Sequence, residues 1–359
     1  MTSSALLTDL YELTMIQGYY LEQRNPRVIF DMFYRTQPFS SGFSIFAGLG
    51  PLLQALEEFS FSDEDIEYLR STGFFREEFL DYLRDFRFSG DVYAMNEGTV
   101  IFPGEPLLRI HSTLIEAQLI ESMLLNIINF QSLVATKAAR IFLASNCSKV
   151  LEFGLRRAQG WDGALSASRA AYIGGAVATS NTLAGKTYGI PVSGTMAHSW
   201  VMAFPSELES FRKFADLYPD KAILLIDTYD TLGSGLDNAI KVGKQLKERG
   251  KRLGVRIDSG DLAYLSQKVR ERLDREGLED ALITASNDLN EEIIHQLVTD
   301  GAPIDLWGVG THLVTGGSSA AFSGVYKLAA KEFDGMMLPT IKVSNNIEKT
   351  TNPGKKQVY

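Results

Sequence analysis

The sequence predicts an α/β protein whose larger part is a barrel of strand–loop–helix units, complete or irregular. Two observations predict this class. The first third of the chain mixes helical and strand-like segments. After Cys147, six short apolar segments recur, the last four at intervals of about 20 to 30 residues, each followed by a polar or glycine-containing stretch and a helix-like segment. Six such units favour a barrel, although their periodicity also fits an open doubly wound sheet.

The amino-terminal third contains elements of both kinds. Apolar positions at helical spacing predict a helix over residues 5–22, with Thr8 as its N-cap. Residues 27–34 are rich in β-branched and aromatic side chains and predict a strand. Two short amphipathic helices with acidic first turns are expected within 59–69 and 76–83.

Three more segments complete the elements outside the repeats. Residues 91–110 hold strand-like pieces separated by turn residues, which is typical of a small antiparallel sheet. The pattern is helical from residue 113 to about residue 145, and it is strand-like again over 325–343.

Composition limits the classes of protein that remain. The 359 residues are 45% hydrophobic and 22% charged, which fits a globular protein of two domains. A net charge of −9 argues against a nucleic-acid partner or a basic membrane-surface protein, while local anion binding stays open. The single cysteine, Cys147, excludes an internal disulfide. We expect a cytoplasmic protein, because no basic signal-like start and no run of about 18 apolar residues is present.

Acidic residues follow two of the repeated apolar segments. Asp227 and Asp230 follow AILLI, and Asp258 and Asp261 follow LGVRI. The carboxyl ends of parallel strands meet at one face, where carboxylates can hold Mg²⁺ or stabilise a developing cation. Asp230 and Asp261 fit helix capping equally well. For Asp258, between Arg256 and a Ser-Gly pair, a functional role is favoured.

Glycine-containing stretches follow the sixth apolar segment, at 309–311 and 315–319. Backbone N–H groups in such a loop can cradle a phosphate, and late loops of phosphate-binding barrels often do so. A plain turn with glycine in a left-handed conformation explains the same pattern.

His198 and the segment 152–160 are further candidates. His198 follows a loop rich in Pro, Gly and Ser, yet a lone histidine is more often structural. Phe153 could stack on a flat ring, and Arg156 or Arg157 could pair with a carboxylate or phosphate. The plain alternative is an arginine pair at an exposed helix start. The sequence contains no zinc motif, Walker loop, dinucleotide fingerprint or nucleophile elbow.

Several long motifs, taken in order, resemble the nicotinate phosphoribosyltransferases over nearly the whole chain. They are LLTDLYELTM (6–15), FYRTQPFSSGFSIFAGL (33–49), GEPLLRI (104–110), LLNIINFQSLVATKAARI (124–141), EFGLRRAQG (152–160), SGTMAHSW (193–200), DTYDTLGSG (227–235), VRIDSGDL (255–262), ASNDL (285–289) and WGVGTHLVT (307–315).

The resemblance implies a type II phosphoribosyltransferase fold. This fold has an open α/β sandwich domain at the amino end, expected here over 1–115 and completed by 326–359, and an irregular α/β barrel over 116–325. The reaction it implies joins nicotinate to phosphoribosyl pyrophosphate, giving nicotinate mononucleotide and pyrophosphate in NAD salvage. It further implies ATP as a co-substrate, Mg²⁺ bound mainly through substrate phosphates, and a homodimer or dimer of dimers that shares its sites.

The resemblance also implies roles for individual residues. The catalytic residues are His198, as a phosphohistidine, and Asp258, to which the strand-end acid Asp227 is added. The residues expected at nicotinate or the phosphoribosyl group are Tyr11, Phe153, Arg156, Thr195, Arg256 and Thr311. Those expected at phosphoribosyl pyrophosphate are Arg35, Ser259, Gly260, Asn287, Asp288, Gly308 and Gly310. No metal ligand is assigned, although Asp258 could reach Mg²⁺.

Rival functions predict other residues. A nicotinamide enzyme invites an acid partner for the amide, and residues 176–186 contain none. A quinolinate enzyme suggests a denser cluster of basic residues than 152–160 supplies. A Schiff-base aldolase needs a lysine that ends a strand, whereas Lys149 and Lys221 precede apolar runs. A non-catalytic phosphosugar-binding protein would have no need of His198.

Overall fold

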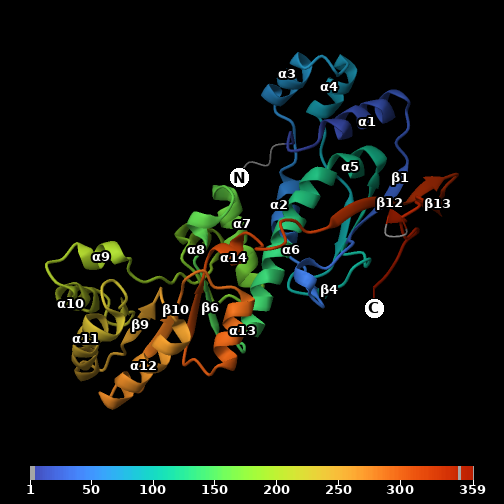
Figure 1. The fold of residues 1–359 in the computed structure, drawn as a ribbon. Coiled ribbons are helices and arrows are strands. Elements are labelled where there is room, and N and C mark those ends of the chain that lie inside the picture. The colour runs from blue at the N-terminus through green and yellow to red at the C-terminus, as the bar shows by residue number, and fades with distance from the viewer. Residues whose placement is uncertain (1–4, 347–348, 359) are drawn as a thin grey trace. The chain divides into compact units, whose positions relative to one another are not determined.

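The computed structural model describes residues 5–346 and 349–358, and the chain divides into two units. One unit comprises Met1–Leu133 with Ala321–Tyr359, and the other, the barrel unit, comprises Val134–Ala320 (Figure 1). The domain bounds expected from the sequence, 1–115 with 326–359 and 116–325, stay a prediction. We describe each unit by itself.

The first unit combines a sheet with helices. Its helical elements are α1 (Leu10–Leu21), η1 (Pro38–Ser40), α2 (Leu49–Glu57), α3 (Asp63–Ser71), α4 (Glu77–Arg84), α5 (Leu114–Leu119) and the beginning of α6 (Glu121–Ala144). Its strands are β1 (Arg27–Tyr34), β2 (Ser44–Ile45), β3 (Asp91–Ala94), β4 (Val100–Ile101), β5 (Leu108–Thr113), β12 (Gly324–Phe333) and β13 (Met336–Pro339). The α/β character expected for this part of the chain is confirmed.

Strand β1 is the centre of the main sheet in this unit. The strand order is β13-β12-β1-β5-β3, with antiparallel pairing between each pair of neighbours. Residues 28–32 are all buried, because β1 has strands on both sides and packing on both faces. Its aromatic side chains pack on β12 and the segment before it: Phe30 stacks on Tyr326 at 4.7 Å and Tyr34 on Phe322 at 4.5 Å between ring centroids.

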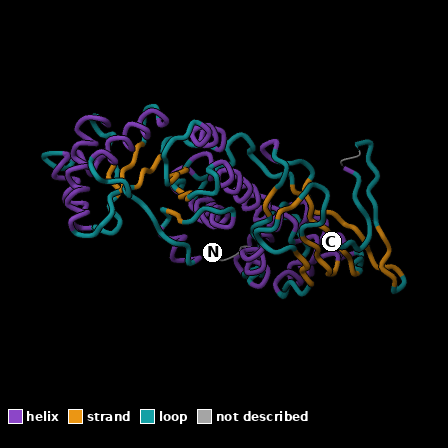
Figure 2. The backbone as a smooth tube through the Cα atoms, turned by 90° about the horizontal axis from the view of Figure 1, so that it is seen from below, coloured by secondary structure: helices purple, strands orange, loops and turns teal. Residues whose placement is uncertain are grey.

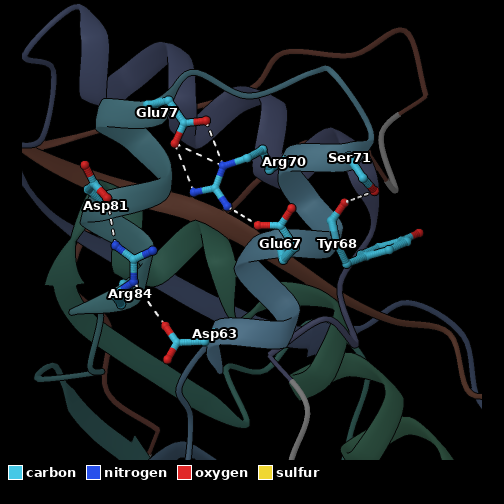
Figure 3. A network of polar contacts seen from close by, with 8 residues as sticks. All are labelled: Asp63, Glu67, Tyr68, Arg70, Ser71, Glu77, Asp81 and Arg84. Carbon is cyan, nitrogen blue, oxygen red and sulfur yellow. Dashed lines mark hydrogen bonds and ion pairs between the residues drawn. The ribbon is translucent and has the colours of Figure 1, made fainter.

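Helices α3 and α4 are joined on their exposed side by ion pairs (Figure 3). Arg70 binds Glu67 within α3 and Glu77 of α4, and Arg84 of α4 binds Asp63 at 3.2 Å. The first turn of α3 carries a capping box, in which Ser62 and Asp65 each accept the other's backbone N–H. Exposed pairs of this kind contribute about 0–1 kcal/mol each, so buried apolar residues stabilise this region more than the charges do.

The barrel unit is built from parallel strands and helices. Its strands are β6 (Lys149–Glu152), β7 (Ala178–Thr179), β8 (Ile223–Leu225), β9 (Gly254–Ile257), β10 (Leu282–Ala285) and β11 (Leu306–Val309). Besides the end of α6, its helical elements are η2 (Leu155–Arg157), α7 (Trp161–Ile173), α8 (Thr182–Tyr188), α9 (His198–Met202), α10 (Glu207–Leu217), η3 (Thr231–Gly235), α11 (Leu236–Glu248), α12 (Leu262–Arg275), α13 (Glu291–Thr299) and α14 (Thr311–Val314). In Figure 2 these strands lie among the helices.

The strand order in this unit is that of an irregular barrel. The order β7-β6-β11-β10-β9-β8 follows the chain around a circle, and the last strand, β11, pairs in parallel with the first, β6. A doubly wound sheet would instead reverse direction at a switch point. Within the described residues no ladder joins β7 to β8, although an isolated bridge adds Val192 beside Thr179. The predicted irregular α/β barrel is therefore confirmed, with its circle open between these two strands.

Most of the expected elements form where the sequence places them. Helix α1 is an exception at its start, because Asp9 and not Thr8 occupies the N-cap, and Thr8 instead donates a hydrogen bond to the Glu12 side chain. The capping alternative is confirmed for Asp230 and Asp261, whose side chains accept the backbone N–H groups of Gly233 and Tyr264. No helix within the described residues has the length and apolarity that crossing a membrane requires.

Candidate active site

A cavity of about 580 Å³ opens at the carboxyl ends of the barrel strands. We call it the strand-end cavity. Its lining residues are Phe153, Arg156, Arg157, Ser180, Gly194, Thr195, Met196, Ala197, His198, Leu225, Arg256, Asp258, Ser286, Asn287, Asp288, Gly308, Gly310 and Thr311. All of them belong to the barrel unit. This is the face at which barrel enzymes carry out their chemistry.

Arg256 is held from three sides at the floor of this cavity. Its Nε donates to Ser286 at 2.7 Å, one terminal nitrogen donates to Thr195 at 2.8 Å, and the other pairs with Asp258 at 2.8 Å. The guanidinium also lies 5.9 Å from the centre of the Phe153 ring. A rigid, fully charged guanidinium of this kind is suited to bind an anion without reorganising.

Asp258 stays ionised because of the same neighbours. Burial on its own favours the neutral acid, but the hydrogen bond from Ser286 and the charge of Arg256 outweigh it and lower the pKa of Asp258 below its ordinary value. Its second carboxylate oxygen lies 3.9 Å from Nε2 of His198. Asp258 therefore presents a fixed negative charge to the cavity beside the positive charge of Arg256.

His198 begins helix α9 and its ring is partly exposed to the cavity, with a side-chain exposure of 42%. Its Nδ1 lies 3.1 Å from the hydroxyl of Thr228, which follows Asp227 after β8. The ring is thereby held between Thr228 on one nitrogen and Asp258 on the other. This arrangement orients the imidazole while leaving it reachable by a ligand.

Asp227 lies behind Asp258. One of its oxygens accepts the backbone N–H of Asp258 at 3.1 Å and the hydroxyl of Ser259 at 2.5 Å. The other oxygen is buried and has no hydrogen-bond partner among the described residues. Within that same part of the chain, no group of three or more acidic, His or Cys side chains forms a metal cage. A carboxylate oxygen with an unused acceptor fits a cation held largely by other ligands.

The ring of Phe153 lies against strand β11, and this close approach requires a glycine at position 308. A Cβ on Gly308 would lie 2.7 Å from Cδ2 of the Phe153 ring. Phe153 also donates its backbone N–H to Val309 at 2.8 Å, which fixes the loop that carries Arg156. Gly308, expected from the sequence at phosphoribosyl pyrophosphate, thus also has a steric role toward the aromatic ring.

The backbone after β10 is strained where it enters the cavity. Asn287 and Asp288 have φ values of 98° and 45°, in a backbone region that residues other than glycine rarely adopt. Such conformations cost of order 1–3 kcal/mol each and are concentrated at functional sites.

The structure brings together most of the residues that the sequence predicts for the site. Those that line the cavity are Phe153, Arg156, Thr195, His198, Arg256, Asp258, Asn287, Asp288, Gly308, Gly310 and Thr311. Three other predicted residues do not line the cavity: Asp227, Ser259 and Gly260. Asp227 accepts hydrogen bonds from Asp258 and Ser259, and Ser259 and Gly260 directly follow Asp258 in the chain. Tyr11 on α1 and Arg35 after β1 belong to the other unit, so their relation to the cavity stays a prediction.

Sequence reasoning missed several lining residues. Ser286 is the most important of them, because it binds both Arg256 and Asp258. Its position directly after β10 was the available signal. Ser180 follows β7, a strand of only two residues that gives no pattern of its own. Gly194, Met196, Ala197 and Leu225 carry no chemistry that a sequence could reveal.

Comparisons with known proteins identify the family. Residues 6–129 match the model of the nicotinate phosphoribosyltransferase N-terminal domain, and residues 148–354 match that of the nicotinate phosphoribosyltransferase family. The chain is 49% identical to a nicotinate phosphoribosyltransferase of Bacillus subtilis over 358 residues, which are 99% of this chain and 73% of that protein. It is 46% identical to one of Mycobacterium tuberculosis over 355 residues, 99% of this chain and 75% of that protein.

A solved structure has the same fold. The crystal structure of human nicotinic acid phosphoribosyltransferase superposes with a TM-score of 0.81 at 34% sequence identity, covering 90% of this chain and 74% of that one. Both family models, two relatives of high identity and this superposition indicate the same family. The chain therefore belongs to the nicotinate phosphoribosyltransferase family and is a transferase.

Proposed function

We propose that the strand-end cavity is where this enzyme transfers the phosphoribosyl group of phosphoribosyl pyrophosphate to nicotinate, giving nicotinate mononucleotide and pyrophosphate for NAD salvage. The observation that carries the proposal is the convergence of Arg256, Asp258 and His198 at the carboxyl ends of the barrel strands.

The chemistry needs the kind of side chains that line this cavity. Breaking the bond between ribose C1 and pyrophosphate builds positive charge on the sugar and negative charge on the leaving group. The pyridine nitrogen of nicotinate is the nucleophile, so the protein supplies orientation and charge and no attacking group. The ionised Asp258 would stabilise the sugar cation. Arg256 and the backbone near Gly310 and Thr311 would bind anionic groups of the substrates.

The ring of nicotinate has an aromatic surface available at Phe153. Stacking on that ring, with the substrate carboxylate near Arg156 or Arg256, would present the nitrogen toward the sugar. Tyr11 is proposed for the opposite face of the pyridine ring and Arg35 for the diphosphate, both from the partner in a dimer. Mixing a Tyr11→Ala variant with a His198→Ala variant tests this, since a shared site would regain coupled activity and an unshared one would not.

Mg²⁺ fits the acidic pair at the ends of β8 and β9. Asp227 has a buried oxygen without a partner, and Asp258 is ionised beside it. These two residues would hold the ion together with the substrate phosphates. When bound, Mg²⁺ would neutralise the charge of pyrophosphate as it leaves.

ATP is proposed as the co-substrate, and His198 as the residue that it phosphorylates. A phosphohistidine at the cavity would favour a conformation that binds substrate tightly, so hydrolysis would draw the transfer toward product. The partly exposed ring and its contact with Thr228 support this role. A His198→Ala variant should lose ATP consumption and keep slow, uncoupled transfer; ATP hydrolysis that survives this change contradicts the role.

A carboxylate substrate is favoured over its amide. Ser180 lines the cavity, in the segment where an amide-binding enzyme would offer an acid. The experiment is incubation with phosphoribosyl pyrophosphate and Mg²⁺, with and without ATP, and with nicotinate, nicotinamide or quinolinate in parallel. Mononucleotide and pyrophosphate should form fastest from nicotinate. A faster reaction with nicotinamide or quinolinate, or no pyrophosphate release at all, contradicts the proposal.

A further inference from the structure

Glu152 is a buried carboxylate that the proposed reaction does not use. It is the last residue of β6 and has no exposed surface. Its oxygens accept the backbone N–H of Gly154, the hydroxyl of Ser168 at 2.8 Å and the hydroxyl of Thr179 at 2.5 Å. Its hydrogen-bond partners among the described residues are therefore three uncharged donors.

Two of these donors, Gly154 and Thr179, belong to the segments that reach the strand-end cavity first along the chain, and the third, Ser168, lies in α7. Gly154 lies between Phe153 and Arg156, in the loop after β6. Thr179 ends β7 and directly precedes Ser180, whose backbone N–H is donated to the main-chain oxygen of Glu152 at 2.9 Å. Glu152 therefore forms hydrogen bonds both with the loop after β6, which carries Phe153, and with the segment at the end of β7, which carries Ser180.

The network continues to the helices behind the loops. Asn181 donates its backbone N–H to the Thr179 hydroxyl at 2.9 Å and its amide to Ser168 at 3.2 Å, while its side-chain oxygen caps α8. The loop after β6 has little room to shift on its other side, because a Cβ on Gly154 would lie 2.3 Å from a methyl of Val314. The position of Phe153 is therefore set by Glu152 on one side and by α14 on the other.

We infer that Glu152 is a positioning residue for nicotinate, which fixes the loop of Phe153 and Arg156 relative to Ser180 without touching substrate itself. This inference rests on the proposed binding of the pyridine ring at Phe153. A carboxylate is required because an amide in its place offers one accepting oxygen and a nitrogen that only donates. Of the three donors that Glu152 accepts, at least one would then lose its acceptor, and the fixed N–H of Gly154 cannot reverse its role.

The chain offers a matched control in Glu116. It too is a buried carboxylate that accepts a backbone N–H, from Ser89 at 3.0 Å, and two hydroxyls, those of Ser89 at 3.1 Å and Ser112 at 2.6 Å. It belongs to the first unit and does not line the strand-end cavity. Glu116→Gln therefore makes the same chemical change without moving the ring-binding loop.

The experiment compares kcat and the separate KM values for nicotinate and phosphoribosyl pyrophosphate in Glu152→Gln, Glu116→Gln and the unchanged enzyme. Glu152→Gln should raise KM for nicotinate about tenfold and leave KM for phosphoribosyl pyrophosphate within about twofold. Glu116→Gln should lower Tm and leave both KM values unchanged. An unchanged nicotinate KM in Glu152→Gln, or a loss of kcat with both KM values constant, overturns the inference.

Two further variants keep the result decisive. If Glu152→Gln does not fold, Thr179→Val removes one donor at constant shape and should raise the nicotinate KM about threefold; no rise overturns the inference. Phe153→Ala separates this inference from the function on which it rests. If the KM for nicotinate is unchanged in Phe153→Ala, both the proposed ring site and the positioning role are contradicted. If that KM rises in Phe153→Ala but not in Glu152→Gln, only the positioning role is contradicted.

Discussion

At the scale of single residues, the chemistry of the site depends on a carboxylate kept charged by its neighbours. Asp258 and Asp261 follow the same strand, yet Asp258 meets Arg256 and Ser286 while Asp261 caps helix α12. Two identical side chains three positions apart therefore have different roles. Sequence alone left the role of Asp261 open, because a strand end is also a helix start.

We predict that Asp258→Asn lowers kcat/KM by about 10²–10³-fold, because it removes the negative charge proposed to stabilise the sugar cation. Asp261→Asn is the control, since asparagine caps a helix as well as aspartate does. Its activity should stay within about twofold of the unchanged enzyme. Steady-state rates of mononucleotide formation measure both. Equal losses in the two variants would show that charge near this strand end, and not Asp258, matters.

Glu12 gives the protein a pH-dependent stability. Burial, with a smaller contribution from Glu121, raises the pKa of Glu12 to about 7 from its ordinary 4.5. Because the folded state binds this proton more tightly than the unfolded state does, the stabilisation is complete below pH 4.5 and is lost as pH rises through 7. The loss is on the order of 3 kcal/mol.

We predict that Glu12→Gln makes the free energy of unfolding less dependent on pH between 5 and 8, and raises it at pH 8. Urea denaturation at several pH values is the measurement. The control is Glu77→Gln, which removes an exposed ion pair with Arg70 in the same unit. This change should leave the pH dependence of the free energy of unfolding unaltered. A slope that Glu12→Gln does not alter contradicts the assignment.

At the scale of elements, the sequence predicts the long, strongly patterned segments and misses the short ones. Strands β8 to β11 end where the chain turns polar, so their loops could be named in advance. Strand β7 has only two residues, and the apolar segment before Ser193 forms only a single bridge, at Val192. A hydrophobic period needs several residues to be visible, and neither segment has them. The hydrogen-bonding role of Glu152 could not be predicted, because nothing in a sequence distinguishes a buried glutamate from an exposed one.

Helices α6 and α13 are joined by a buried ionic cluster. Glu291 of α13 binds Lys137 at 2.6 Å and Arg140 at 2.8 Å, both from α6. Burial opposes the charged form, but the hydrogen bonds from Lys137 and Arg140 lower the pKa of Glu291 below its ordinary value. Removing one partner of such a cluster leaves an uncompensated buried charge, which costs about 3–5 kcal/mol.

We therefore predict that Glu291→Gln lowers the free energy of unfolding by about 3 kcal/mol. The comparison is Glu276→Gln, which removes the exposed partner of Lys244 and should leave the free energy of unfolding nearly unchanged. Chemical denaturation at neutral pH measures both. Similar small losses in the two variants would mean that the buried cluster contributes no more than a surface pair.

At the scale of the whole molecule, the first unit is assembled from both ends of the chain. Residues 28–34 of β1 pair with β12, and Tyr326 and Phe322 belong to the same hydrophobic core as the amino-terminal residues. The sequence showed strand-like segments at both ends. The resemblance implied that 326–359 complete the amino-terminal domain, but the pairing of β1 with β12 could not be read from the sequence, because contact between distant segments leaves no local pattern.

We predict that a chain ending after Ala320 fails to fold its first unit, because β1 loses its neighbour and two aromatic stacks. A chain ending after Asp334 keeps β12, lacks only the edge strand and the segment beyond it, and should retain the core. Limited proteolysis followed by mass spectrometry will locate the cleavage sites. Equal protection of residues 27–34 in both shortened chains would contradict the prediction.

The pairing of β1 with β12 also sets an order of events during translation. The ribosome releases β1 about three hundred residues before its partner strand, and the barrel unit is made entirely in the interval. The unit that is begun first is therefore completed only after the barrel unit has been made. Throughout that interval one edge of a buried apolar strand is uncovered, so nascent chains of this enzyme should present a binding site for chaperones until β12 has been made.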